Sequence, residues 1–166
     1  MGWGTGEQLQ NNFDKLSFLC FFHDIHLSRP ELLKVFSKEE LENGGFSPEE
    51  EEIINNHANK IATFVQSFPH APSGVDVLLR QHHGTLNGVG FTERYSASIS
   101  PMAIAFIVVE RFVSLLLELS EDQFINYKTY LPNIFGTLRS IFQVPSYKRV
   151  IDTLEMVLKK TSAPVS

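Results

Sequence analysis

Six side chains of the kinds that bind metal ions stand at intervals along this chain of 166 residues. Each lies on an apolar helical stripe or at the end of one, where burying a polar group without a partner is costly. They are His23, Asp24, His57, His82, His83 and Glu110. Taken singly, each has a plainer explanation, such as a hydrogen-bonded core histidine or, for Glu110, a partner for Arg111. A metal centre that is ligated from several helices would explain all six together.

The pairing of histidine with carboxylate defines the chemistry that such a centre would support. The Asp24 carboxylate, next to His23 at the end of a helical stripe, can bridge two cations with its two oxygens, whereas an imidazole binds one. The doublet His82-His83 offers two nitrogen ligands in diverging directions. Imidazole and carboxylate ligands suit iron, manganese or zinc. We therefore expect a divalent transition metal, two ions if the site is intact, with Asp24 as the catalytic carboxylate.

Helices must position these side chains, because apolar residues recur at steps of three and four over residues 9–23 and 54–68. Ser47-Pro48-Glu49-Glu50 is a strong helix start, with a cap, a proline at the first helical position and acids in the first turn. A short helix is predicted over residues 73–82, and residues 84–98 form a loop. Further helices are expected to begin at Ser100-Pro101, Ser120, Pro132 and Pro145. The pattern predicts an all-α fold.

Composition narrows the class of protein. The length suggests one domain with a sizeable core, and a formal net charge of -5 argues against a nucleic-acid partner. The single Cys20 fits a reducing compartment, and without a signal-peptide pattern we expect a cytoplasmic protein. Residues 99–119 are long enough to span a membrane, but a charge at their centre would cost about 2.5–3.5 kcal/mol. We therefore predict a buried helix there and no membrane span.

The order His-Asp, His, His-His with a glycine-rich loop, and then an acid in an apolar helix resembles the HD superfamily of metal-dependent phosphohydrolases. More narrowly it resembles the HD-GYP branch, whose members hydrolyse cyclic di-GMP. The family's HDIGK reads HDIHL at residues 23–27, and its HHExxDGxGYP reads HHGTLNGVGFT at residues 82–92. The aspartate of the family's final helix falls on Glu110. The resemblance implies an HD-domain helical bundle over residues 1–119, with residues 120–166 as C-terminal helices packed on the same domain.

The resemblance keeps the metal ligands but changes the residues expected on the substrate side. The lysine of HDIGK is Leu27, the arginine of the final helix is Ile104 and the tyrosine of the GYP motif is Phe91. A charge-assisted phosphate contact is worth about 1.5–3 kcal/mol, so losing two cations would weaken phosphodiester binding strongly. We also expect that the family's first helix, which supplies a further histidine, is missing from this chain.

The resemblance implies a divergent HD-GYP-like metal-dependent phosphodiesterase, a signalling hydrolase of weak or altered activity on cyclic di-GMP or a related nucleotide. Two cations that share Asp24 would acidify a water for in-line attack on phosphorus. The alternative is a catalytically inactive HD-fold module for signalling or protein interaction. The loop of residues 84–98, with Gly88, Gly90 and Phe91, would then contact a protein partner in place of the nucleotide substrate.

Overall fold

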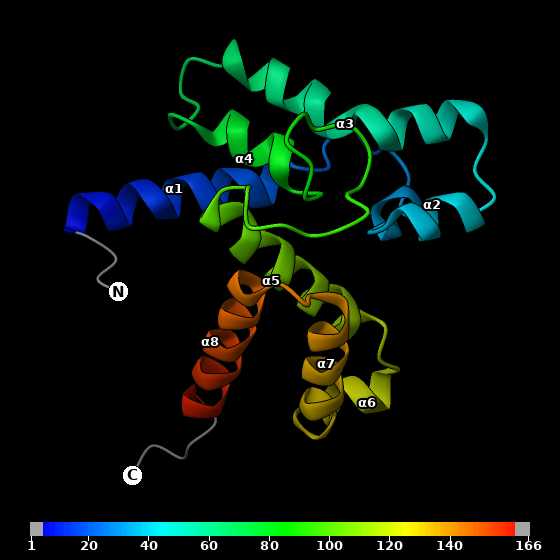
Figure 1. Ribbon diagram of the computed structural model, residues 1–166, viewed down its shortest axis with the longest axis vertical. Coiled ribbons are helices and arrows are strands. Elements are labelled where there is room, and N and C mark those ends of the chain that lie inside the picture. The colour runs from blue at the N-terminus through cyan, green and yellow to red at the C-terminus, as the bar shows by residue number, and fades with distance from the viewer. Residues whose placement is uncertain (1–4, 162–166) are drawn as a thin grey trace. The chain divides into compact units, whose positions relative to one another are not determined.

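The computed structural model describes residues 5–161, which form α-helices and one 3-10 helix joined by loops (Figure 1). None of these residues forms a strand, so the predicted all-α fold is confirmed. The chain divides into two compact units, which we call the first unit, up to Arg94, and the second unit, from Tyr95. Each unit is described by itself. The division into a family core of residues 1–119 and C-terminal helices of residues 120–166 stays a prediction.

The first unit is built on three helices that pack through α4, which contacts both α1 and α3 (Figure 1). Its elements are α1 (Gly6–Phe22), the 3-10 helix η1 (Leu32–Lys34), α2 (Lys38–Asn43), α3 (Pro48–Gln66) and α4 (Val75–Gln81). Helix α3 begins as predicted, because the Ser47 hydroxyl accepts from the Glu50 N–H while the Glu50 carboxylate accepts from the Ser47 N–H. This reciprocal cap satisfies two N–H groups that a helix start leaves open.

The core of the first unit has two parts. Leu19, Ile61 and Leu79 are fully buried, one from each of the three packed helices. A second apolar cluster lies around the 3-10 helix and α2, and it consists of Leu27, Leu32, Val35, Leu41 and Ile54, with Phe46, Ile53 and Phe91 packed against it. Ile54 belongs to α3, so this helix is held in the second cluster one turn before His57.

The second unit contains α5 (Pro101–Leu117), α6 (Glu121–Ile125), α7 (Tyr127–Ile141) and α8 (Pro145–Thr161). Helix α5 packs against α7 and α8, which also contact one another. Aromatic rings fill much of the interior: Phe112 stacks on Phe135 with centroids 5.6 Å apart, and Phe142 stacks on Tyr147 at 5.2 Å. As predicted, α5 begins after the Ser100 cap, α6 after the Ser120 cap and α8 at Pro145.

The prediction that Pro132 begins a helix is wrong. Helix α7 starts at Tyr127, and Pro132 lies inside it. A proline there removes one helical hydrogen bond and costs about 3 kcal/mol. The apolar face continues across it, with Ile134 and Leu138 buried, and each such side chain contributes about 1.5–3 kcal/mol. Packing of this face therefore offsets the proline.

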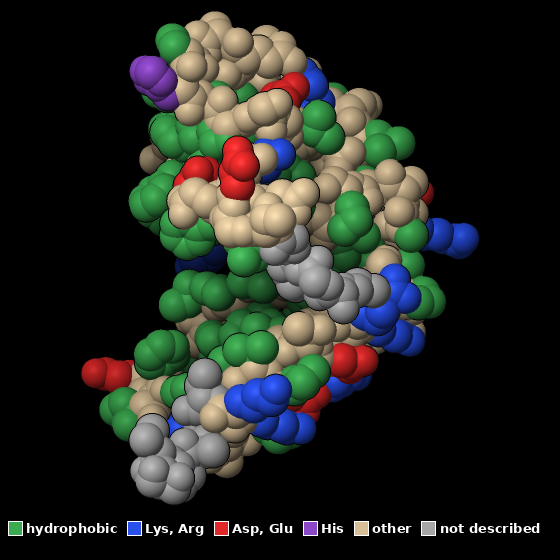
Figure 2. Space-filling view, turned by 90° about the vertical axis from the view of Figure 1, so that its left-hand side faces the viewer, with side chains coloured by type: hydrophobic (Ala, Val, Ile, Leu, Met, Phe, Trp, Pro, Cys, Tyr) green, Lys and Arg blue, Asp and Glu red, His purple; other side chains and the backbone are tan. Residues whose placement is uncertain are grey.

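The apolar stretch of residues 99–119 forms α5, and within residues 5–161 no helix combines the length and apolar character that crossing a membrane requires. Large hydrophobic side chains are nevertheless exposed in both units. Phe21 is 80% exposed in the first unit and Leu117 is 73% exposed in the second. Figure 2 shows that hydrophobic side chains occur among charged ones over much of one face of the molecule.

Candidate metal centre

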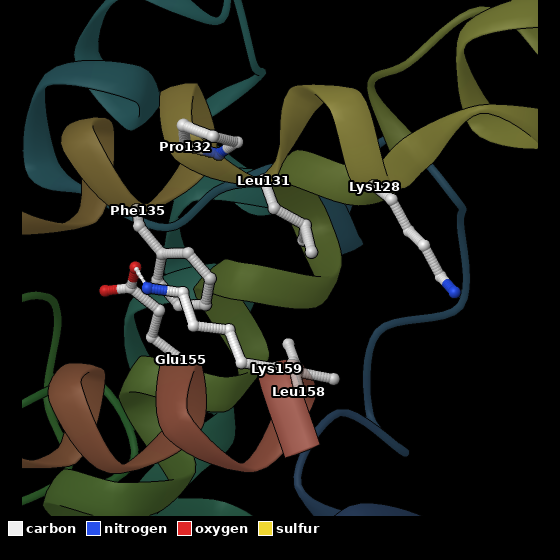
Figure 3. Close-up of a pocket in the computed structure, with 7 residues that line it drawn as sticks. All are labelled: Lys128, Leu131, Pro132, Phe135, Glu155, Leu158 and Lys159. Atoms are coloured by element: carbon white, nitrogen blue, oxygen red, sulfur yellow. Dashed lines mark ion pairs between the residues drawn. The ribbon is translucent and has the colours of Figure 1, made fainter. Parts of the chain in front are cut away.

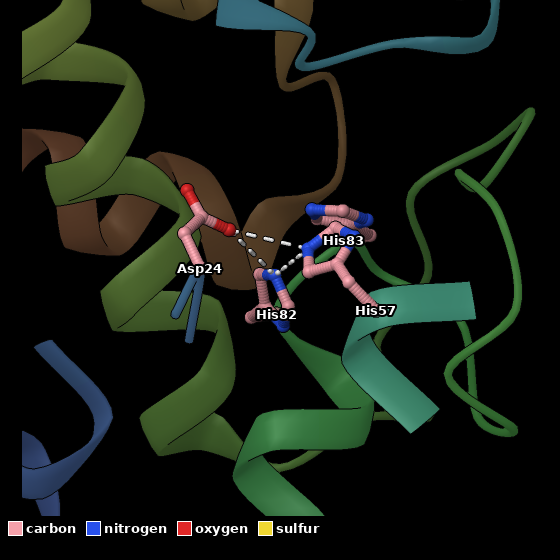
Figure 4. Close-up of side chains that lie close together, drawn as sticks. All are labelled: Asp24, His57, His82 and His83. Carbon is pink, nitrogen blue, oxygen red and sulfur yellow. Dashed lines mark hydrogen bonds and ion pairs between the residues drawn. The ribbon is translucent and has the colours of Figure 1, made fainter. Parts of the chain in front are cut away.

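Three elements of the first unit bring four of the predicted ligands together (Figure 4). His23 is the C-cap of α1, so Asp24 follows directly after that helix. His57 lies in the middle of α3, and His82 and His83 follow the last residue of α4. Asp24, His57, His82 and His83 each offer one ligand atom, and these four atoms lie within 4.8 Å of one another. The packing of α4 against α1 and α3 therefore assembles the cluster.

The distances inside the cluster match those between ligands of a single ion. Nε2 of His57 lies 3.2 Å from Nε2 of His82 and 3.2 Å from Oδ1 of Asp24. Nε2 of His82 lies 3.7 Å from the same oxygen. Two nitrogen ligands at about 2.0–2.1 Å from a tetrahedral zinc ion are roughly 3.3 Å apart. The three atoms are thus spaced as ligand atoms of one metal ion would be.

The hydrogen bonds of the histidines determine which ring nitrogen faces the cluster. Nδ1 of His57 lies 2.7 Å from the Ile54 carbonyl, and Nδ1 of His82 lies 2.7 Å from the Leu79 carbonyl. A carbonyl only accepts, so both Nδ1 atoms donate, and each Nε2 is left either to hold a proton toward Asp24 or, in the neutral imidazole, to offer a lone pair to a cation. Two lone pairs and a carboxylate oxygen facing one another repel unless a proton or a cation lies between them. The donor set therefore fits a bound metal ion, whose histidine ligands usually donate their other nitrogen in this way.

Asp24 is ionised and faces histidines with both oxygens. Burial by itself would raise the pKa of Asp24, but hydrogen bonding to His57 and His82 and the charge of His23 hold that pKa well below its usual range. Oδ1 faces His57 and His82, whereas Oδ2 lies 3.3 Å from Nε2 of His23. His23 also donates from Nδ1 to a backbone carbonyl, that of Leu19 at 3.1 Å. The two carboxylate oxygens are thus directed to different imidazoles, as in a bridging carboxylate.

His83 is the fourth member of the cluster. Burial of the imidazole is the main cause that lowers the pKa of His83 well below its ordinary value, and the neighbouring rings of His82 and His57 lower it further when they are protonated. Of the predicted loop residues, Phe91 stacks on the His83 ring with centroids 4.2 Å apart, and Gly88 and Gly90 are hydrogen-bonded to α3.

Three other positions bear on the prediction. Glu110 is half-buried on α5 in the second unit, and its role as a ligand stays a prediction. Leu27, at the position of the family's lysine, is buried in the apolar cluster of the first unit. Ile104, at the position of the family's arginine, is buried on α5. Both positions therefore hold buried, uncharged side chains.

The backbone carbonyls that orient the histidines were not anticipated from the sequence. Those of Ile54 and Leu79 lie three residues before His57 and His82, and that of Leu19 lies four residues before His23. This spacing is the one at which a helical side chain can reach back to the preceding turn. The position of each histidine near a helix turn could therefore have predicted which backbone carbonyl its Nδ1 reaches.

The second unit contains a separate cavity of about 340 Å³ between α7 and α8 (Figure 3). Its wall is largely apolar, with Leu131, Phe135 and Leu158. The carboxylate in the wall, Glu155, pairs with Lys159 at 2.7 Å and with Arg139 at 2.6 Å. Because this carboxylate is already paired with two cations, the histidine cluster is the stronger candidate for chemistry.

Comparisons of the chain with protein-family models, with curated proteins and with solved structures found no match. A functional proposal therefore depends on the geometry of the cluster and on the order of its residues in the sequence.

Proposed function

We propose that this protein binds a divalent transition metal ion through Asp24, His57, His82 and His83 and uses it to hydrolyse a phosphodiester. The observation that carries the proposal is the convergence of two imidazole Nε2 atoms and one carboxylate oxygen at 3.2–3.7 Å from one another. Imidazole with carboxylate suits iron, manganese or zinc. Such an ion, when bound, polarises a phosphoryl oxygen and lowers the pKa of water.

The residues of the chain supply orientation and charge. Backbone carbonyls hold the rings of His57 and His82 with Nε2 toward the cluster. Asp24 stays ionised and directs its second oxygen to His23, where a second cation would share it. His57 and His82 are each 1% exposed, while the side chains of His23 and Asp24 are 19% and 21% exposed. A substrate would therefore reach the cluster on the side of His23 and Asp24.

The order of the ligands, which resembles that of HD phosphohydrolases, supports a phosphodiester as the substrate. The glycine-rich loop after His83, which resembles the GYP segment, supports a cyclic dinucleotide. Cyclic di-GMP is thus the first substrate to test, and a related nucleotide is the second.

A specific observation favours a second candidate function, a catalytically inactive HD-fold module that binds a protein partner through residues 84–98. Leu27 takes the position of the lysine that contacts phosphate in the family that the chain resembles. It is packed in the apolar cluster with Ile54, so no cation at this position faces a substrate. A module that binds a partner does not need that contact.

The two functions are separated by metal analysis and turnover on the same preparation. The chain is reconstituted anaerobically with ferrous iron or manganese, assayed for bound metal and incubated with cyclic di-GMP. We expect hydrolysis by the unaltered chain and by the control Asp14→Ala, whose carboxylate is exposed on α1. Asp24→Ala should lose at least about 100-fold in activity, since even outer residues of metal sites cost 10–100-fold.

Each negative result has its own meaning. Absence of bound metal after reconstitution would overturn the metal-dependent enzyme. Hydrolysis that Asp24→Ala leaves unchanged would exclude the proposed chemistry at this cluster. Bound metal together with bound but intact cyclic di-GMP would favour the interaction module.

A further inference from the structure

His83 is held in place differently from the other histidines of the cluster. Nδ1 of His23, His57 and His82 each donates to a backbone carbonyl. Within residues 5–161, no hydrogen bond to a ring nitrogen of His83 is present, and its ring is held by aromatic contacts. Phe91 stacks on it at 4.2 Å with an interplanar angle of 18°. The rings of His82 and His57 approach it at 4.0 and 4.7 Å, tilted by 58° and 67°.

The segment that carries Phe91 is bonded to α3 on both sides of His57. The Gly90 N–H donates to the Asn55 carbonyl at 2.7 Å, and the Asn59 N–H donates to the Gly88 carbonyl at 3.1 Å. In a regular α-helix, the residue-55 carbonyl and the residue-59 N–H are partners of each other. The loop therefore bonds to the turn of α3 that contains His57.

Backbone geometry makes this attachment depend on glycine. Gly88 has a φ of +73°, and a Cβ there would lie 3.0 Å from the Asn59 nitrogen and 3.2 Å from the Arg80 Cα. Only glycine permits both this conformation and this approach. After Phe91 the chain returns to the cluster, because the Thr92 N–H donates to the His83 carbonyl at 3.2 Å. Residues 88–92 thus connect the turn around His57 to His83.

We propose that Phe91 is a positioning residue, which fixes the His83 imidazole as a ligand of the cluster. The attachment of the Phe91 loop to α3 keeps His83 in register with His57. This role rests on the proposed metal binding. A parallel aromatic neighbour restricts rotation of the imidazole, as a carbonyl does for the other histidines. Loss of a hydrogen-bonded partner of a metal ligand typically weakens metal affinity by about 10–100-fold, and we expect loss of this stack to act at the lower end of that range.

The test is titration with cobalt(II), whose visible absorption reports the ligands of the ion. Phe91→Leu removes the ring, and we expect binding weaker by about tenfold or more together with an altered cobalt spectrum. Phe91→Tyr keeps the ring and should bind as the unaltered chain does. Val89→Ala is the matched control, since Val89 is an exposed side chain of the same loop. Phe91→Met, which is longer and more flexible than leucine but also lacks the ring, replaces Phe91→Leu if the latter does not fold.

A metal-free measurement tests the stack separately. In proton NMR spectra, the ring current of Phe91 should displace the His83 ring signals, and this displacement should vanish in Phe91→Leu and persist in Phe91→Tyr. Cobalt binding by the unaltered chain together with equal affinity and an equal spectrum in Phe91→Leu would overturn the positioning role alone. Absence of cobalt binding by the unaltered chain would instead overturn the proposed function, and the ligand role of His83 with it.

Discussion

If the proposed site binds a metal ion, replacing Asp24 by asparagine should abolish most of the stabilisation that the ion confers on the folded chain. A ligand that binds only the folded state at 100 times its Kd stabilises that state by about 2.7 kcal/mol. In a protein of this size, 1 kcal/mol shifts Tm by about 2–4 °C, so zinc or manganese at that concentration should raise Tm by roughly 5–11 °C. The Asp24→Asn amide is uncharged, yet it stands 3.2 Å from Nε2 of His57 where the carboxylate did. If affinity falls by about 100-fold, the stabilisation falls to about 0.4 kcal/mol and the shift in Tm to below about 2 °C.

The assay is thermal unfolding with and without metal, compared within each variant. Metal-free Asp24→Asn should itself be less stable near neutral pH. The folded-state pKa of Asp24 is below its ordinary value, so the carboxylate stabilises the fold above about pH 4 and loses this effect as the pH falls further. Asp14→Asn is the matched control, because Asp14 is exposed and accepts a hydrogen bond from Gln10. A metal-induced shift in Asp24→Asn as large as in the unaltered chain would refute the reasoning.

Three further predictions concern the stability of the metal-free protein, measured by urea unfolding. Because the pKa of His83 is lowered in the fold, the unfolded chain binds a proton that the folded chain excludes. Lowering the pH from about 6.5 to 5.5 should therefore reduce the free energy of unfolding by up to about 1 kcal/mol. His83→Gln should remove this part of the pH dependence, and an unchanged pH dependence in this variant would contradict the prediction. Leu27→Lys should destabilise the fold by about 2–5 kcal/mol or more, since this is the cost of losing a buried leucine. Leu27→Met should destabilise the fold by less than about 1.5 kcal/mol. Equal stability of the two variants would show that position 27 is open to solvent. Gly88→Ala should destabilise by more than about 1 kcal/mol, because its Cβ would meet the Asn59 nitrogen. Gly136→Ala, in open space on α7, should stabilise by about 0.5–1 kcal/mol, and the reverse order would contradict the glycine argument.

Helix starts were predictable because the interactions that make them are local. The Ser47 cap, its Glu50 partner and Pro48 lie within four residues, and the Ser100 and Ser120 caps work over two and three residues. Pro132 was misread for the opposite reason. Its local preference for the first helical position is outweighed by burial of Ile134 and Leu138, which depends on helices elsewhere in the chain.

The candidate cluster was predictable in its residue types but not in its geometry. The spacing of His57 on the apolar stripe of α3 and of His82 at the end of α4 indicated that both would be buried, as they are. The burial of Leu27 next to Ile54, and the stacking of Phe91 on His83, could not be deduced from their neighbours in the sequence. The first depends on contact with α3, which begins well after Leu27 in the chain, and the second on a loop that is hydrogen-bonded back to α3.

The sequence by itself determined the all-α fold, most of the helix starts and the identities of the candidate ligands, since capping bonds and apolar periodicity act within a few residues. Only the tertiary structure decided that Nε2 of His57 and Nε2 of His82, 25 residues apart in the chain, lie 3.2 Å from each other. That distance is a result of packing α4 against α3, and the direction of each ring depends on the backbone carbonyl to which its Nδ1 donates. Side-chain chemistry follows from residue types, whereas the convergence of the two Nε2 atoms and the Asp24 oxygen depends on contacts between distant segments.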